Sequence, residues 1–87
     1  MEIRVGKVTH YYNHISVAVL ELTGNLEVGD AIHILGRITD FDQRIGSMEI
    51  EHQKVHSVGP GMEIALKVIE PVRAGDTVFK LVEDKEK

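Results

Sequence analysis

The chain contains no cysteine and no tryptophan, and its 87 residues include only two prolines, two phenylalanines and two tyrosines. Without cysteine, neither a disulfide nor a thiolate metal site can form, so stability must come from packing and backbone hydrogen bonds. No apolar run approaches the roughly 20 residues of a membrane-spanning helix, and the first residues, MEIRVGKV, lack the features of a signal peptide. We therefore expect a cytoplasmic protein with no membrane partner.

Basic residues are outnumbered, with 10 Lys and Arg against 14 Asp and Glu, which gives a formal net charge of −4. A strongly basic groove for nucleic-acid phosphates is therefore not expected. The chain also lacks a G-x-x-x-x-G-K-[ST] loop, which excludes GTP binding by a P-loop. The length predicts one domain over residues 1–82, followed by a charged, frayed tail over residues 83–87.

Apolar residues alternate with polar ones along much of the chain. In MEIALKV, which begins at Met62, every second residue is a large apolar one, as in a half-buried strand. HISVAVLEL, which begins at His14, is apolar at neighbouring positions and is typical of a more central strand. About six or seven short strands are predicted in this way, and no long stretch has helical periodicity.

Two similar phrases, LEVGDAIHIL from Leu26 and VRAGDTVFKL from Val72, each place Gly-Asp before an alternating run. Gly29 and Gly75 are predicted to supply a positive φ in a tight turn, where Asp30 and Asp76 bond backbone amides. Gly61 belongs to a weaker third copy, in which Met replaces Asp. These residues are interpreted as structural turns.

Repeated turns between short antiparallel strands predict an all-β fold, a small closed antiparallel barrel of about six or seven strands. The expected core consists mainly of β-branched and leucine side chains: Ile15, Val17, Val19, Ile32, Ile34, Ile50, Ile64, Leu66, Val68 and Val78.

Candidate catalytic groups are few. The His10 and His14 pair would share one face only on a helix, whereas that segment is predicted to be strand, turn and strand, so no metal site is expected. The carboxylates of Asp40 and Asp42 lie two residues apart, as do those of Glu49 and Glu51, and each pair is interpreted as a solvated strand face. We expect no enzymatic activity and no cofactor.

The order of strands and turns resembles the β-barrel that follows the GTPase domain of elongation factor Tu. The similarity covers nearly the whole chain, from GKVTHYYNHISVAVLEL to VRAGDTVFKL. Around VTHYY and MEIEH the chain looks still more like stand-alone translation elongation factor-like small proteins and the C-terminal barrel of collagenase-like peptidases. The resemblance implies a translation-protein type barrel without the catalytic domains of either relative.

This resemblance implies a non-catalytic binding module that docks on a protein or ribonucleoprotein partner. The alternative is direct binding of an RNA end, since the elongation-factor barrel helps to hold aminoacyl-tRNA and its apolar-Glu-apolar strand matches the one around Glu49. The candidate binding residues are Glu49 and the nearby His52, with Tyr11 and Tyr12 from the aromatic segment HYYNH.

Overall fold

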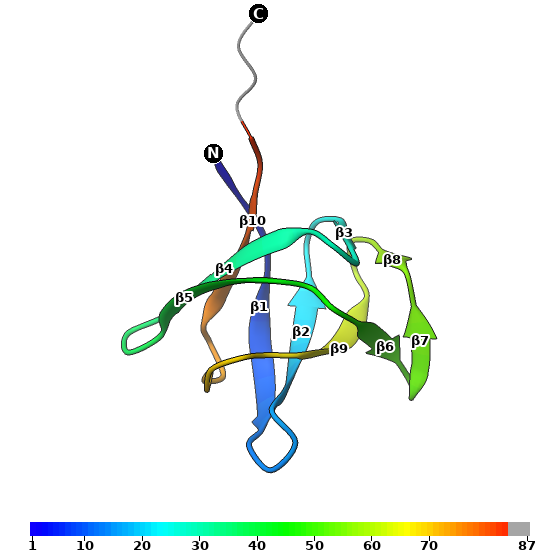
Figure 1. Ribbon diagram of the computed structural model, residues 1–87, viewed down its shortest axis with the longest axis horizontal. Helices are drawn as coiled ribbons and strands as arrows, with labels where there is room; N and C mark the ends of the chain where they lie inside the picture. The colour runs from blue at the N-terminus through cyan, green and yellow to red at the C-terminus, as the bar shows by residue number, and fades with distance from the viewer. Residues whose placement is uncertain (84–87) are drawn as a thin grey trace, which may run out of the picture.

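The computed structural model describes residues 1–83, which form ten strands and two antiparallel sheets (Figure 1). Residues 84–87 of the predicted frayed tail lie outside the described residues, and Glu83, the first residue of that tail, is exposed. The strands are β1 (Glu2–Tyr12), β2 (Val17–Leu22), β3 (Leu26–Glu27), β4 (Ala31–Leu35), β5 (Asp40–Arg44), β6 (Met48–Ile50), β7 (Gln53–Val55), β8 (Ser57–Val58), β9 (Glu63–Lys67) and β10 (Thr77–Leu81).

Eight strands form the main sheet, in the order β5-β4-β10-β1-β2-β9-β6-β7, and β3 pairs with β8 in a small separate sheet. The long strand β1 occupies the middle, where it pairs with β10 on one side and β2 on the other. Figure 1 shows the sheet curling, so that β4 and β5 pass across β1. The fold is therefore all-β, as the alternating sequence predicts.

The predicted closed barrel of six or seven strands is wrong, because the eight-stranded sheet ends at β5 and β7 and these edges do not pair. Where β5 approaches the end of β9, a side chain joins them in place of the backbone hydrogen bonds that would pair two strands. The Gln43 amide donates to the Lys67 carbonyl oxygen at 3.0 Å, and its own oxygen accepts from the Ile69 amide at 2.8 Å. The curled sheet is thus bridged by a side chain and remains open.

The strand count also differs because MEIEHQKV, which is strand-like throughout in the sequence, forms a hairpin of two strands. Glu51 and His52 both have positive φ, at 51° and 68°, and turn the chain between β6 and β7. Neither residue is a glycine or asparagine, so the sequence contains no ordinary signal for this turn.

The core is confirmed at Ile32, Ile34, Ile64, Leu66, Val68 and Val78, all of which are buried. The predicted core face of β2 is wrong. Ala18, Leu20 and Leu22 point inward, whereas Val17 and Val19 are only half-buried. Glu21 shares the face of Val17 and Val19, and a charged side chain must remain in water, so this face turns outward.

Two further residues of the predicted core lie elsewhere. Ile15 is 57% exposed in the loop between β1 and β2, and Ile50 only packs against the core from its margin.

The three turn glycines have positive φ, at 98° for Gly29, 85° for Gly61 and 97° for Gly75. Each aspartate accepts a backbone hydrogen bond from the residue three positions earlier: Asp30 from Glu27 and Asp76 from Arg73, both at 2.9 Å. These bonds hold the chain as it enters β4 and β10. Across residues 1–83, no helix is long and apolar enough to cross a membrane.

Candidate functional site

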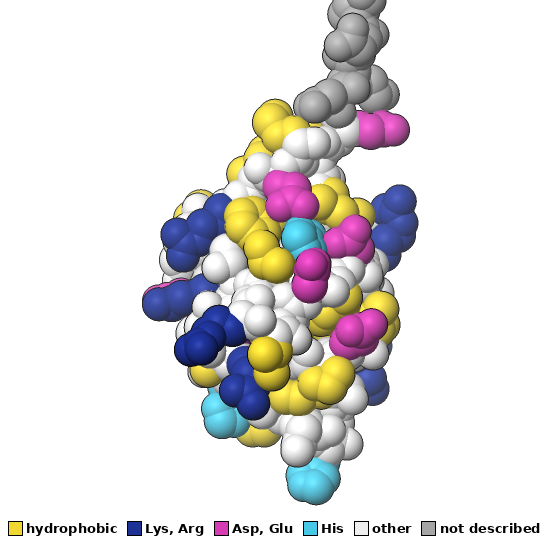
Figure 2. Space-filling model, turned by 90° about the vertical axis from the view of Figure 1, so that its left-hand side faces the viewer, with side chains coloured by type: hydrophobic (Ala, Val, Ile, Leu, Met, Phe, Trp, Pro, Cys, Tyr) yellow, Lys and Arg dark blue, Asp and Glu magenta, His cyan; other side chains and the backbone are white. Residues whose placement is uncertain are grey.

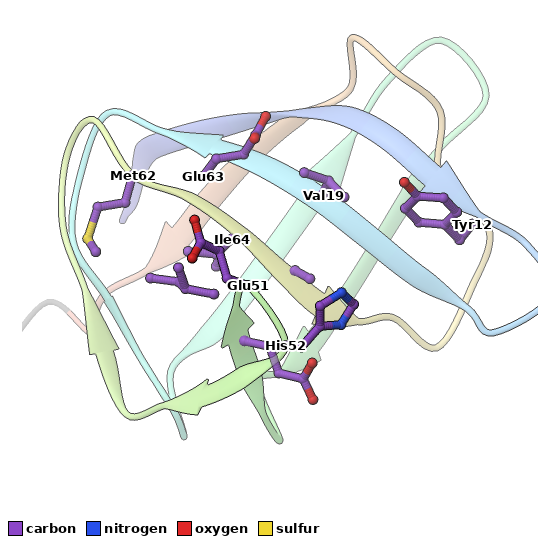
Figure 3. Close-up of a pocket in the computed structure, with 10 residues that line it drawn as sticks. Tyr12, Val19, Glu51, His52, Met62, Glu63 and Ile64 are labelled. Atoms are coloured by element: carbon purple, nitrogen blue, oxygen red, sulfur yellow. The ribbon is translucent and has the colours of Figure 1, made fainter.

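A groove of about 600 Å³ lies on the outer face of the sheet, over β2, β9 and β6 (Figure 3). Figure 3 shows Tyr12 at one end, Met62 at the other and Val19 between them, with His52 on the side of the β6–β7 turn. The volume is in the range of small-molecule and peptide side-chain sites. Its walls come from four strands and one turn, so the fold determines its shape.

The floor is hollow because its central side chains are small. Val19 on β2 faces Ala65 on β9, and Ala65 also faces Glu49 on β6. Neighbouring strands place such partners about 5 Å apart on the same face, so a short side chain in the middle leaves a depression between longer ones. Ala65 is thus the residue that opens the groove.

The ends of the groove are formed by large side chains. Tyr12 is 50% exposed and Met62 is 40% exposed, so both present apolar surface to a ligand. The Tyr12 ring lies beside the His10 imidazole, with ring centroids 4.3 Å apart, which fixes the aromatic end of the groove. Apolar and aromatic surface of this kind is typical of ligand sites.

Three carboxylates, of Glu49, Glu51 and Glu63, line the groove. None forms an ion pair with another residue of the described chain. Glu49 faces Lys54 in the β6–β7 register, but Glu63 faces a second carboxylate, Glu21. Like charges in register are destabilising, so the fold retains here an arrangement that costs it stability.

The β6–β7 turn contributes Glu51 and His52 to the groove. Non-glycine residues with positive φ cost on the order of 1 kcal/mol or more each, and they persist where the surroundings or a function require them. Two in succession at the margin of a groove make this turn a candidate binding element.

The structure brings together three of the four predicted binding residues, because Glu49, His52 and Tyr12 all line the groove. Tyr11 does not join them. Successive residues of a strand point to opposite faces, and Tyr11 packs against the core while Tyr12 faces outward. Sequence reasoning missed Glu63 and the floor at Val19 and Ala65; the small alanine within EIALK is the signal that could have indicated a hollow.

A different charge arrangement occupies the face formed by β4, β5 and β10. There, acidic side chains gather around one histidine (Figure 2). His33 has Nδ1 2.7 Å from Glu2 and Nε2 2.7 Å from Asp40. The hydrogen bond to Asp40, together with Glu2 and the nearby Asp42 charge, raises the pKa of His33 against the opposing effect of burial.

These contacts stabilise an imidazolium with both nitrogens donating. Among the described residues, no group of three His, Cys, Asp or Glu side chains could hold a metal ion.

Sequence comparison relates nearly the whole chain to parts of larger proteins. It is 36% identical over 83 residues to the "Uncharacterized protease MJ0090" of Methanocaldococcus jannaschii, covering 94% of this chain and 20% of that protein. It is 33% identical over 81 residues to a collagenase of Porphyromonas gingivalis, covering 91% of this chain and 20% of the collagenase. The two relatives are thus named as a protease and a collagenase. The chain spans about a fifth of their length, and no protein-family model matches it.

Solved structures with the same fold come from the C-terminal domain of a putative U32 peptidase of Geobacillus thermoleovorans. One superposes with a TM-score of 0.85 at 21% identity and covers 93% of both chains. A selenomethionine variant gives a TM-score of 0.82 at 20% identity, with 86% of this chain and 95% of the other covered.

These relatives support the peptidase part of the predicted resemblance, whereas the elongation-factor part is not shown. The prediction of a translation-factor-type binding module is therefore wrong. The alternative of an RNA end rested on the same resemblance and loses its basis with it. The error has a physical cause: repeated Gly-Asp turns and alternating strands specify a way of folding, which unrelated functions share.

Proposed function

We propose that the chain is a non-catalytic accessory domain of the collagenase-like peptidase type, and that it binds polypeptide in the groove over β2, β9 and β6. The observation that carries this proposal is the apolar hollow above Val19 and Ala65, with a ring at one end and a thioether at the other. The sequence similarity supplies the context, because its relatives are named as proteases and collagenases.

The geometry favours an extended polypeptide over a small metabolite. The groove lies open on a sheet face and is lined by residues of several strands, with polar and apolar groups along it. Extended peptides commonly bind through alternating apolar pockets and polar contacts. A ligand of this kind would place one side chain over Ala65 and lie against Tyr12 and Met62.

We expect catalysis to take place in another domain of the peptidase and not in this one. Peptide hydrolysis requires an activated side-chain nucleophile, or a water molecule activated by a metal ion or by carboxylates, in a site that excludes bulk water. The groove instead offers carboxylates on an open surface. We expect the chain to bind polypeptide without cleaving it, and we expect it to act in the cytoplasm, where a chain without cysteine needs no oxidising compartment.

Peptides from heat-denatured collagen are a suitable probe, because a homologue is named a collagenase. The labelled peptides would be titrated with the chain and followed by fluorescence anisotropy. Wild-type chain should bind, and Ala65→Leu, which fills the hollow without adding charge, should weaken binding by about tenfold. Failure of the wild-type chain to bind any peptide would overturn the proposal.

The matched control is Ala31→Leu, which adds the same atoms to another half-buried alanine, on β4. It should bind like the wild type. Equal losses in both variants would mean that the Ala65 effect comes from general damage to the sheet.

A further inference from the structure

We infer that the groove selects a segment carrying an aliphatic side chain next to a lysine or arginine. This inference rests on the proposed function, and it names the chemistry of the polypeptide that the groove holds. The argument combines the shape of the floor with the charges that surround it.

The floor fits an aliphatic side chain. Ala65 and Val19 present methyl groups to the groove, whereas Ile64 is buried in the core and Ile50 packs against it. A branched or unbranched aliphatic group would displace water from this surface, which is the main source of favourable free energy in such sites. A charged or amide side chain in the same place would lose part of its hydration against the methyl groups of Val19 and Ala65.

The margin fits a cation. Glu49 has Lys54 as its cross-strand neighbour, which partly neutralises it. Glu63 and Glu51 differ from it: Glu63 faces Glu21, and Glu51 lies in the turn with no partner across a ladder. Figure 3 shows Glu51 and Glu63 in the part of the groove between Met62 and Val19. A cation from the ligand would therefore supply the positive partner that these two carboxylates lack.

The apolar floor and the unneutralised carboxylates lie side by side, so one dipeptide unit can satisfy both. With an aliphatic residue over Ala65, the adjacent side chain of an extended segment points away from the floor, and a long basic side chain there is long enough to bend back to Glu51 or Glu63 at the margin. Long basic side chains also cover apolar surface with their methylene stems, which suits a groove with an apolar floor.

A second copy of the chain also carries side chains of this chemistry. Ile38 is 74% exposed at the turn between β4 and β5, and it follows Arg37 in the sequence. This pair has the same aliphatic and basic chemistry, and the face that carries the turn also has several Lys and Arg side chains (Figure 2). Self-association is accordingly an outcome that the experiment must detect.

The experiment uses short labelled peptides in a Gly-Ser background with Ile-Arg, Ile-Gln, Ile-Glu or Ser-Arg at the centre. Anisotropy should show Ile-Arg binding about tenfold more tightly than Ile-Glu at low salt, with Ile-Gln between them. The advantage of Arg should shrink as salt rises above about 0.3 M, because exposed charges are then screened. Ser-Arg should bind weakly, since it leaves the floor empty.

The double variant Glu51→Gln with Glu63→Gln should lose the difference between Ile-Arg and Ile-Glu while keeping its affinity for Ile-Gln. The matched control, Glu27→Gln on β3, removes an exposed carboxylate outside the groove and should behave like the wild type. Equal affinity of the wild-type chain for Ile-Arg and Ile-Glu would overturn the inference and leave the proposed function standing. Absence of binding by all four peptides would overturn both.

Light scattering of the wild-type chain completes the test. A monomer that binds Ile-Arg supports the inference. A dimer that Ile38→Asp converts to a monomer, and that must dissociate before any peptide binds, would assign the groove to a second copy and overturn it.

Discussion

The two halves of the main sheet differ in whether their charged side chains form ion pairs and hydrogen bonds within the fold. On the β4–β5–β10 side, His33 lies between Glu2 and Asp40, Arg44 donates to the Gly29 carbonyl oxygen, and Lys80 lies 3.7 Å from Asp30. On the groove side, Glu49, Glu51 and Glu63 form no ion pair within residues 1–83.

The difference distinguishes charges that serve the fold from charges that are available to a ligand. Paired groups stabilise the native state modestly. The groove carboxylates gain no such stabilisation, and Glu63 costs stability because it faces Glu21. Substitutions should therefore have opposite signs in the two halves, and this expectation can be tested in order of the size of the effect.

The largest effect is expected for Gly36→Ala, on the β4–β5–β10 side, where the charged groups are paired. A Cβ at this position would overlap the Asp76 carboxylate, which is 5% exposed and accepts the Arg73 amide. We expect a loss of about 2–3 kcal/mol in the free energy of unfolding, measured by urea titration, because the turn must shift or lose its hydrogen bond. The control is Gly46→Ala, where a Cβ would meet no atom within 4 Å. A similar loss in both variants would mean that backbone freedom, rather than the Asp76 contact, explains the result.

The next effect has the opposite sign and lies in the groove half. Replacing Glu51-His52 with Asn-Gly should raise the free energy of unfolding by about 1 kcal/mol, because Asn and Gly adopt positive φ with little strain. The same variant should bind peptide more weakly, as measured by anisotropy. Ser16→Gly relieves a positive φ of 57° outside the groove and should stabilise without affecting binding. A destabilised Asn-Gly variant would contradict the idea that this turn stores strain.

A smaller, pH-dependent effect is expected at His33. Because the folded state raises its pKa, the contribution to stability is fully present below the unfolded pKa of about 6.5 and is lost as pH rises through the higher folded value. The partners Glu2 and Asp40 are largely solvent-exposed, so the contribution should be about 0.5 kcal/mol. Urea titrations on either side of this window should show wild type losing stability relative to His33→Gln as pH rises. A gain would refute the proposed sign.

The smallest effect compares one carboxylate from each half. Glu63→Gln should stabilise by about 0.3 kcal/mol, because it removes repulsion with Glu21 across the β2–β9 ladder. Glu2→Gln should destabilise by a similar amount when measured near pH 6, because it removes an acceptor of His33. Thermal unfolding of both variants under the same conditions gives the two signs directly. Matching signs would remove the distinction between the two halves.

Much of the fold follows from local signals in the sequence. Alternation predicts the strands, and the glycines of the Gly-Asp phrases have the positive φ that such turns require. The orientation of β2 was harder to predict, because apolar residues lie on both faces and only Glu21 distinguishes them. The open sheet could not be predicted, since it depends on where the Gln43 amide meets residues 67 and 69, a contact distant in sequence.

The polar residues of the candidate site could be predicted from the sequence, but the shape of the groove could not. Glu49, His52 and Tyr12 attract notice as residue types, and the fold brings them to one groove. The hollow depends on Ala65 lying between Val19 and Glu49, which only the strand register establishes. The small alanine within EIALK indicates a gap in the sequence of large side chains, and its importance appears once its neighbours on β2 and β6 are known.

The two ends of the described chain lie together, because β1 begins where β10 ends and Glu2 pairs with Leu81 (Figure 1). A force that separates these ends would load the β1–β10 hydrogen bonds one after another, starting at this pair. It would not load all of them at once, as a force along the strands does. The pairing of β1 with β10 should therefore separate at a lower force than if all its hydrogen bonds were loaded together. Tension on the two ends would peel β10 from β1 before it disturbed the groove on the other side of β2.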